Sequence, residues 1–254
     1  MKIERVLVVL PSYNENENIV NLMEAILALG PGYAVCVVDD SSPDGTHELV
    51  RRAIESKEWA ARAHLIVRAK KDGRGGAVRT GFQWGHDSGR GFQAYVEMDC
   101  DFSHEPKSIP TGIAKLEAGA DVVLGSRYPD GKIEGWPIQR HVFSFLANFL
   151  ARTLIHSGVH DFTNGFRFYS PAAVEVLLLN SQKHKGYIYL SESLSQLLLA
   201  GMSIREFPIY FKNRVRGVSN TSFAEVKNAL LGIFSIAREH RRRRTGRKIE
   251  SRAG

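Results

Sequence analysis

Residues 94–101 read Ala-Tyr-Val-Glu-Met-Asp-Cys-Asp, a strand-like run that ends in two carboxylates one residue apart. A short apolar run with β-formers predicts a buried strand. At its end, Asp99 and Asp101 can reach the same divalent cation. Mg²⁺ or Mn²⁺ would suit them, because these hard ions take oxygen ligands and commonly bridge a substrate phosphate. The tripeptide alone also occurs in solvated turns, so its place at a strand end carries the interpretation.

The same strand pattern recurs on both sides of this stretch, with helical patterns in between. Strands are predicted at Val6–Leu10, Tyr33–Val38, His64–Val67 and Asp121–Gly125. Helices are predicted at Thr46–Ser56, from a Gly-rich turn at 73–76 to about Trp84, and from Pro106 to near Gly119. Alternating strands and helices indicate an α/β fold with a mostly parallel, doubly wound sheet.

Polar residues follow three of these strands. They are Pro11-Ser12-Tyr13, Asp39-Asp40 and Asp99 with Asp101. Ligands of doubly wound sheets bind at the carboxyl ends of the strands, so one site can use all three segments. The turn at 73–76 lacks the P-loop pattern, and no G-x-G-x-x-G follows the first strand, which disfavours both of those nucleotide sites.

The pattern changes after residue 125. A Gly/Pro-rich loop is predicted at 126–139, followed by helices at 141–157, 171–179 and 190–201, a strand at 203–211 and a last helix at 221–239. Arginines stand in the loops or at element starts of this half, among them Arg127, Arg140 and Arg214. The planar guanidinium is suited to bidentate phosphate recognition.

Composition restricts the class of protein. The 254 residues are 43% apolar and include two cysteines, which is enough for a full core and no disulfide framework. We find no secretory signal and no run of about 18 apolar residues. Residues 238–254 hold eight Lys and Arg against two Glu, and so carry six of the seven net positive charges. This basic tail is either a solubilising end or an arm for anionic lipids.

The motifs resemble those of inverting family 2 glycosyltransferases of the GT-A fold, and more closely the dolichyl- or polyprenyl-phosphate mannosyltransferases. The matching segments span about residues 4 to 237. In order they are P-S-Y-N-E at 11–15, D-D-S-S-P-D-G-T at 39–46, 71–77, M-D-C-D-F-S-H at 98–104, G-S-R-Y at 125–128, Gly135-Trp136 with Arg140, D-F-T-N-G-F-R-F-Y at 161–169, 185–187, and F-K-N-R-V-R-G-V-S at 211–219.

The resemblance implies a single catalytic domain over residues 1–237, with a nucleotide-sugar-binding half (1–125) and an acceptor-binding half (126–237). From its charge, we expect residues 238–254 to form a basic, disordered tail. It also implies site residues. The donor would be bound by Pro11, Tyr13, Glu15, Asp39, Asp40, Asp99, Cys100, Asp101 and Arg214. The metal would be bound by Asp99 and Asp101, the acceptor phosphate by Arg127, Arg140 and Ser144, and the catalytic set would be Asp101, Arg127 and Arg140.

The implied reaction moves mannose from GDP-mannose to a polyprenyl (dolichyl) monophosphate. A phosphate monoester is largely dianionic at neutral pH, since its second pKa is about 6, and needs no base. A hydroxyl acceptor would need one, and Asp161 is the obvious candidate; otherwise Asp161 is an orienting residue or a turn. The alternative function is another GT-A transferase, for example a glucosyltransferase from a UDP-sugar. A nucleic-acid binder is disfavoured, because the body is nearly neutral.

A polyprenyl acceptor lies in a membrane, which predicts peripheral binding at its cytoplasmic face. The apolar helices at 141–157 and 221–239 either face the membrane interface or pack against the sheet. A small membrane protein is the alternative anchor.

Overall fold

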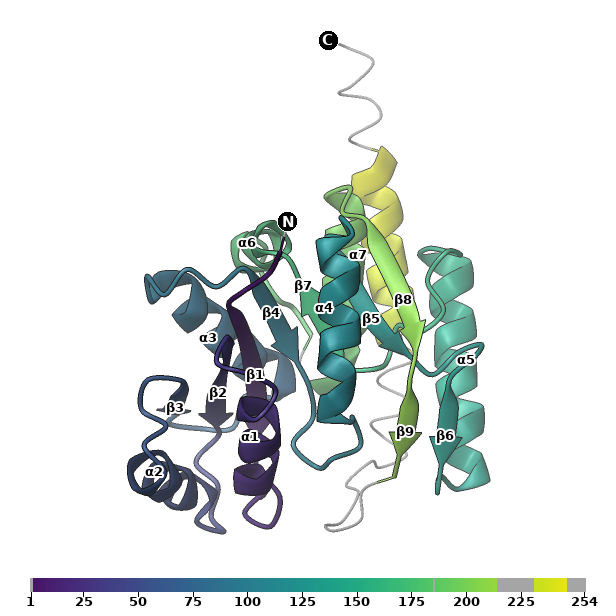
Figure 1. The fold of residues 1–254 in the computed structure, drawn as a ribbon. Coiled ribbons are helices and arrows are strands. Elements are labelled where there is room, and N and C mark those ends of the chain that lie inside the picture. The colour runs from purple at the N-terminus through teal and green to yellow at the C-terminus, as the bar shows by residue number, and fades with distance from the viewer. Residues whose placement is uncertain (1, 185, 214–230, 246–254) are drawn as a thin grey trace.

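The computed structural model describes residues 2–184, 186–213 and 231–245. A seven-stranded sheet runs through it in the order β3-β2-β1-β4-β7-β5-β8, beside a two-stranded sheet of β6 and β9 (Figure 1). The strands are β1 (Val6–Ser12), β2 (Tyr33–Asp39), β3 (Ala63–Val67), β4 (Ala94–Glu97), β5 (Val122–Ser126), β6 (Lys132–Glu134), β7 (Arg167–Tyr169), β8 (Ile204–Pro208) and β9 (Tyr210–Lys212).

Helices cover both faces of the large sheet, as the predicted doubly wound fold requires. They are α1 (Ile19–Leu27), α2 (Thr46–Ser56), α3 (Arg74–Asp87), α4 (Ile109–Glu117), α5 (Ile138–Leu154), α6 (Pro171–Leu179) and α7 (Tyr189–Leu199), with 3₁₀ turns η1 (Pro106–Ser108) and η2 (Gly186–Ile188). Residues 231–245 are also helical.

Two apolar clusters form the core, one on each face. Side chains alternate along a strand, so Leu7 and Val9 of β1 join the cluster under α3, α5, α6 and α7, whereas Val6, Val8 and Leu10 join the one under α1, α2 and α4. The continuous apolar runs seen in the sequence therefore supply both faces at once, which is the pattern of a buried parallel strand.

Strand β7 is the part of the sheet that the sequence pattern did not predict. It pairs antiparallel with β4 on one side and β5 on the other, so a strand from the second half of the chain lies between two strands of the first half. The remaining pairs of the large sheet are parallel. Because β7 runs the opposite way, the residues that precede it lie at the carboxyl edge of β4 and β5.

Other boundaries also differ from the prediction. The glycines at 75 and 76 lie within the first turn of α3, not in a loop, because Gly73 is already the residue before the helix. The strand predicted at 203–211 is divided into β8 and β9, and the loop predicted at 126–139 contains β6.

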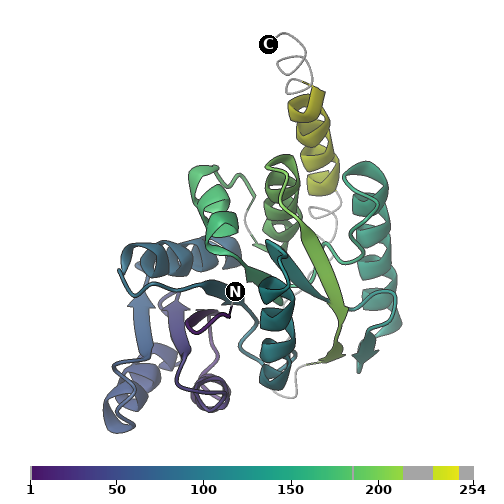
Figure 2. The same ribbon diagram turned by 45° about the horizontal axis from the view of Figure 1, so that its top comes forward.

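The last helix reaches further than predicted. It continues to Thr245, so residues 238–245 of the tail are helical and the prediction of a disordered tail is wrong for them. Ser195 Oγ of α7 lies 2.8 Å from His240 Nδ1, and Ile233, Ile236 and Ala237 join the core. Figure 2 shows this helix, in yellow, running beside α7. Buried contacts, not the local charge, decide where this helix lies.

Candidate active site

Asp39, at the end of β2, is a fully buried carboxylate held by its own neighbours. Its Oδ2 accepts hydrogen bonds from Ser12 Oγ (3.0 Å) and Ser42 Oγ (2.6 Å), and its Oδ1 accepts one from the Ser42 backbone N–H (2.8 Å). The side chain is 0% exposed. Asp39 therefore ties the end of β1 to the loop after β2.

Asp40 stands one residue further on and is paired with an arginine. Arg68 Nη1 lies 3.1 Å from Asp40 Oδ1, and the Asp72 backbone N–H donates to Asp40 Oδ2 at 3.3 Å. Burial raises the pKa of Asp40, although Arg68 opposes that shift. The pair fixes the loop between β3 and α3 against the end of β2.

The loop after β1 places an aromatic ring and a second carboxylate at the same edge. Tyr13 is 37% exposed, and the Lys71 ammonium lies 3.7 Å from its ring centroid. Glu15 Oε2 accepts a hydrogen bond from Asn18 Nδ2 at 3.2 Å. Asn14 has a positive φ of 60°, and α1 begins only at Ile19, so Asn14 and Glu17 do not form a capping box for this helix.

His104 holds the backbone of the D-x-D segment (residues 99–101) in place. His104 Nδ1 accepts a hydrogen bond from the Asp99 backbone N–H at 3.2 Å, so its Nε2 carries the proton and donates to Asn164 Oδ1 at 2.9 Å. Burial lowers the pKa of this histidine. His104 is therefore a neutral, hydrogen-bonding loop residue, and its ring stacks on that of Phe166 with 5.1 Å between the centroids.

Cys100 points away from the carboxylates. Its Sγ–H donates to the Pro11 carbonyl at 3.3 Å, which joins the D-x-D segment to the loop after β1. Burial raises the pKa of the thiol well above its usual value, with Glu15 adding to the effect. Cys100 and Pro11 therefore contribute to the edge through this contact, with the thiol neutral.

The oxygens around Asp101 fit a divalent metal. Asp101 is 8% exposed, and its Oδ1 accepts a hydrogen bond from the Ser103 backbone N–H at 3.0 Å. Ser103 Oγ is buried and has no hydrogen-bond partner, which leaves an orphan oxygen two residues from Asp101. No cluster of three or more His, Cys, Asp or Glu suited to a metal occurs in the described part of the chain. Two carboxylates with a hydroxyl suit a hard ion that takes its remaining ligands from substrate and water.

A buried network that sequence reasoning missed lies behind Asp99. Arg74, the first residue of α3, donates through Nε to Asp99 Oδ1 (2.9 Å) and through Nη1 to Glu97 Oε2 (2.8 Å). Glu97 is 0% exposed and also accepts from the hydroxyls of Tyr169 and Tyr189. A glutamate inside an apolar strand was the available signal, because a buried carboxylate needs partners.

On the other half of the edge, Arg127 and Asp161 form a closed ion pair. Arg127 Nε donates to Asp161 Oδ2 and Nη2 to Asp161 Oδ1, both at 2.8 Å, and Nη2 also donates to Thr163 Oγ1 at 2.7 Å. Burial opposes both charges, but the pair outweighs it: the pKa of Asp161 is lowered and that of Arg127 is raised. The Arg127 side chain is buried, with 5% of its surface exposed.

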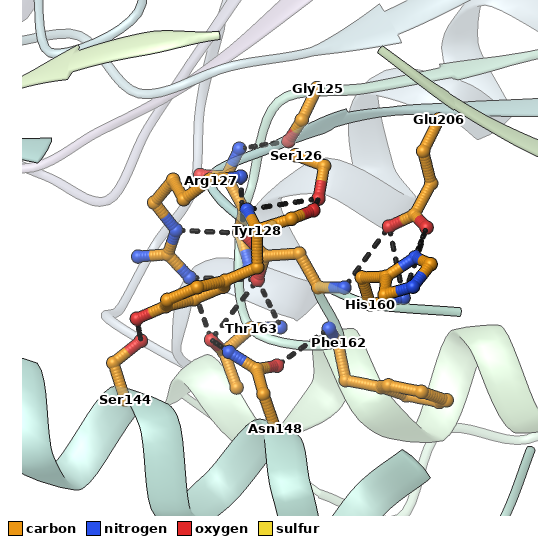
Figure 3. A network of polar contacts seen from close by, with 12 residues as sticks. Gly125, Ser126, Arg127, Tyr128, Ser144, Asn148, His160, Phe162, Thr163 and Glu206 are labelled. Atoms are coloured by element: carbon orange, nitrogen blue, oxygen red, sulfur yellow. Dashed lines mark hydrogen bonds and ion pairs between the residues drawn. The ribbon is translucent and has the colours of Figure 1, made fainter. Parts of the chain in front are cut away.

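Arg140 and Ser144 lie on α5 beside Arg127. Arg140 Nη1 donates to Asn213 Oδ1 at 3.1 Å, and its guanidinium carbon is 4.2 Å from the centroid of Trp136. The Arg127 guanidinium carbon is 5.1 Å from the same ring. Ser144 Oγ accepts a hydrogen bond from the Tyr128 hydroxyl at 3.0 Å (Figure 3). Trp136 therefore brings the two arginines to one place.

The two halves of the edge are joined by hydrogen bonds. Asn164 receives the His104 Nε2–H, donates its Nδ2–H to the Gly125 carbonyl, and donates its backbone N–H to Asp161 Oδ1 at 3.1 Å. One chain of contacts thus runs from Asp99 to the Arg127–Asp161 pair. The structure gathers the expected residues of both halves at one edge, except Arg214, which lies outside the described residues.

A mostly parallel sheet with carboxylates and arginines gathered at the carboxyl edge of its strands is the arrangement of nucleotide-diphospho-sugar transferases with a GT-A fold. The sequence profile of glycosyl transferase family 2 matches residues 7–178, and the chain belongs to that family.

Two curated relatives are similar over most of their length. Polyprenol monophosphomannose synthase of Mycolicibacterium smegmatis is 37% identical over 91% of this chain and 86% of its own. Undecaprenyl-phosphate mannosyltransferase of Micrococcus luteus is 35% identical over 90% of this chain and 92% of its own. Among solved structures, glucosyl-3-phosphoglycerate synthase of Mycobacterium tuberculosis with Mn²⁺, UDP-glucose and phosphoglyceric acid has a TM-score of 0.65 and 18% identity, covering 92% of this chain and 80% of its own.

Proposed function

We propose that this glycosyltransferase moves mannose from GDP-mannose to a polyprenyl (dolichyl) monophosphate with inversion at the sugar. The observation that carries the proposal is the joined edge, where the Asp99–Asp101 segment and the Arg127–Arg140 pair are connected through His104 and Asn164. The curated relatives named above, both polyprenyl-phosphate mannose enzymes by name, support the choice of sugar and acceptor.

The donor half would bind the nucleoside between the loops after β1 and β2. Tyr13 offers a half-exposed ring, and Glu15 and Asp40 offer carboxylate oxygens for base or ribose hydrogen bonds. Asp39 is saturated by serine donors, so its part is to hold these loops in place. A preformed pocket lowers the entropic cost of binding the donor.

Asp99 and Asp101 would bind Mg²⁺ or Mn²⁺, with Ser103 Oγ as a further oxygen. When bound, the ion supplies positive charge for the leaving diphosphate. The chain itself contributes rigidity: Asp101 receives the Ser103 N–H, and His104 fixes the Asp99 backbone. His104 is neutral and buried, so it adds no competing charge beside the carboxylates.

Arg127 and Arg140 would orient the acceptor phosphate for in-line attack. Arg127 is held by Asp161, and Arg140 is held by Asn213 and Trp136. A phosphate monoester is already a nucleophile near neutral pH, so the side chains need only to align it and balance its charge.

The state of Asp161 favours a phosphate acceptor over a hydroxyl acceptor. Its lowered pKa makes it a weak base, and both of its oxygens are occupied by Arg127 and by backbone N–H groups. A hydroxyl nucleophile would need a base at this place. Asp161 is therefore a positioning residue for Arg127.

A polyprenyl acceptor lies in a membrane, and the outer face of α5 is suited to contact that membrane. Ile138, Val142, Phe145, Leu146 and Phe149 lie on one side of this helix and are exposed, with Phe145 at 63% and Phe149 at 55%. Arg140 and Ser144 are on the same helix. Apolar side chains at helical spacing beside basic residues suit the interface of an anionic bilayer, which we place at the cytoplasmic face of a membrane. A small membrane protein is the alternative anchor.

No helix within the described ranges is both long and apolar enough to cross a bilayer. Peripheral contact through α5 would bring the phosphate of a membrane-embedded acceptor to the arginines. The basic tail would add attraction to anionic head groups.

The test is a transfer assay with Mn²⁺ or Mg²⁺, a short polyprenyl phosphate, and labelled GDP-mannose, UDP-glucose and other nucleotide sugars in parallel. We expect label in the organic phase from GDP-mannose alone, and loss of that transfer in an Arg127→Ala variant. Transfer to a polyprenol lacking phosphate, or a preference for UDP-glucose, would contradict the proposal.

A further inference from the structure

Arg74 is a buried cation that lies directly behind the D-x-D segment. Its side chain is 10% exposed, and it is hydrogen-bonded to Asp99 Oδ1, Glu97 Oε2, Tyr189 and the Gly165 carbonyl. It therefore joins the start of α3 to β4, α7 and the loop before β7. Arg74 is not among the site residues that the family resemblance implies.

One guanidinium serves two carboxylates here. Glu97 is fully buried, whereas the Asp99 side chain is 21% exposed at the edge of the site. The Tyr169 and Tyr189 hydroxyls donate to Glu97 as well, so Glu97 keeps partners of its own. The guanidinium of an arginine keeps its charge throughout the ordinary pH range, and Arg74 has both carboxylates within 2.9 Å. Arg74 is permanently charged.

This charge has a direct consequence for Asp99. A carboxylate whose oxygen is held by a guanidinium is a weaker ligand for a cation, and the guanidinium repels the cation as well. A bound diphosphate changes the balance, because its negative charge is attracted by Arg74 and the metal together. The same buried residue therefore opposes a bare metal ion and favours a metal with its diphosphate.

We propose that Arg74 is a positioning residue that couples metal binding to donor binding. By pairing with Asp99, it keeps the affinity of the site for a free divalent ion low and reserves that affinity for the ion together with a nucleoside diphosphate. The proposal rests on the metal part of the proposed function and is independent of the sugar and of the acceptor. The coupling is reciprocal, so the metal must raise the affinity for the diphosphate by the same factor.

The experiment measures Mn²⁺ binding to the full chain by the loss of the free-ion signal in electron paramagnetic resonance, with and without GDP. Arg74→Met removes the charge, Arg74→Lys retains it, and Glu97→Gln leaves Arg74 less compensated. Arg79→Met is the matched control, because Arg79 lies on the same helix but donates to the carbonyls of Leu177 and Asn180 instead of carboxylates. Thermal unfolding of each variant shows whether it is folded at the assay temperature.

We expect Arg74→Met to bind Mn²⁺ alone at least about tenfold more tightly, the effect of removing one charge close to a divalent ion. Its gain in Mn²⁺ affinity on adding GDP should fall by a similar factor. Glu97→Gln should shift the affinity for free Mn²⁺ the opposite way, and Arg74→Lys and Arg79→Met should stay within about threefold of the parent chain.

Two results would overturn the coupling role. One is an unchanged or weaker affinity for free Mn²⁺ in folded Arg74→Met. The other is a shift of the same sign in Arg74→Met and Glu97→Gln, which would indicate a purely structural network. If no variant and no parent chain binds Mn²⁺ even with GDP, the metal assignment itself fails, and the coupling fails with it. Failure of sugar transfer alone leaves the Mn²⁺ result intact.

Discussion

Arg74 and Arg127 are two buried arginines at the same edge of the sheet, and they are used differently. Arg127 forms a two-point pair with one carboxylate, Asp161, which is fully buried. Arg74 is divided between Glu97 and Asp99, and Asp99 lies partly open to the site. The first pair is enclosed within the fold, and the second includes a carboxylate that is 21% exposed.

The difference shows how one type of ion pair can have two purposes. A closed pair costs desolvation that its own hydrogen bonds must repay, and breaking it leaves an uncompensated buried charge. It is therefore suited to holding the direction of Arg127. A shared pair holds Asp99 less completely, and its charge balance changes when an anion or cation arrives. Variants at and around the two ion pairs can test this difference between Arg74 and Arg127.

The largest effect is expected at the proposed metal site, which includes the partly exposed Asp99. Asp101→Asn removes a charge from the proposed metal site and should reduce mannosyl transfer by about a thousandfold or more. Initial rates with GDP-mannose at saturating Mn²⁺ measure it. Asp130→Asn, an exposed carboxylate elsewhere, is the control and should keep the parent rate. A rate within tenfold of the parent for Asp101→Asn would remove the metal assignment.

The Arg127–Asp161 pair should contribute more to the stability of the fold than the Arg74–Asp99 pair. Asp161→Asn leaves the Arg127 charge buried without its partner and should lower the free energy of unfolding by about 3 kcal/mol. Asp99→Asn should cost clearly less, because Arg74 keeps Glu97 and Asp99 is partly solvated. Urea unfolding of both variants makes the comparison. Equal losses would mean that the two pairs do not differ as the structure indicates.

Arg140 should control acceptor binding without holding the fold. Arg140→Ala removes a half-buried guanidinium that is held by Asn213 and stacked on Trp136, and should raise the KM for polyprenyl phosphate by about tenfold. The KM for GDP-mannose should stay unchanged. Steady-state kinetics in both substrates separate the two, with Arg205→Ala on β8 as the exposed control. An equal rise in both values would contradict an acceptor role.

The apolar face of α5 is expected to set membrane affinity. Phe145→Ser or Phe149→Ser should weaken sedimentation with anionic vesicles by about tenfold, because each ring buries apolar area in the interface. Transfer to a short, water-soluble acceptor should be unchanged. Leu179→Ser, an 86% exposed residue at the end of α6, is the matched control. Undiminished vesicle binding in both α5 variants would place the membrane contact elsewhere.

The smallest effect is expected in how the stability of the fold changes at acid pH. The folded pKa of Asp161 is below its unfolded value, so its contribution is complete above about pH 4 and is lost as the pH falls through the lower folded pKa. The parent chain should therefore lose stability below pH 4 more steeply than Asp161→Asn, which has no such proton to bind. Thermal unfolding between pH 2 and pH 6 should show the two curves converging toward acid, according to this linkage. Parallel curves would mean that Asp161 is not a stabilising carboxylate.

The sequence predicted the first half of the fold well because its strands are continuous apolar runs followed by helices at regular spacing. Asp39 and Asp99 were expected at one edge for that reason, and β1, β2 and β4 bring them there. β7 was not predicted, because Arg167-Phe168-Tyr169 is too short to show a period, and its place is set by pairing with two distant strands. The position of Asp161 depends on that pairing.

The partners of the charged residues were also beyond the local pattern. Glu97 reads as one polar residue in a strand, and Arg74 as part of a glycine-rich turn, yet they meet across 23 residues. Which arginine pairs with which carboxylate depends on long-range packing. Family resemblance supplied Arg127, Arg140 and Ser144, but not that Asp161 would hold Arg127.

By itself the sequence determined the class of fold, the edge of the sheet where the candidate site lies, and the residue types there, because periodicity and strand-end position are local properties of the chain. The tertiary structure decided which carboxylates each arginine pairs with: Arg127 has one such partner, and Arg74 has two. That outcome depends on β7 lying antiparallel between β4 and β5 and on α3 beginning beside Asp99. Burial then makes each pairing obligatory, since a charge removed from water must find a partner within the fold.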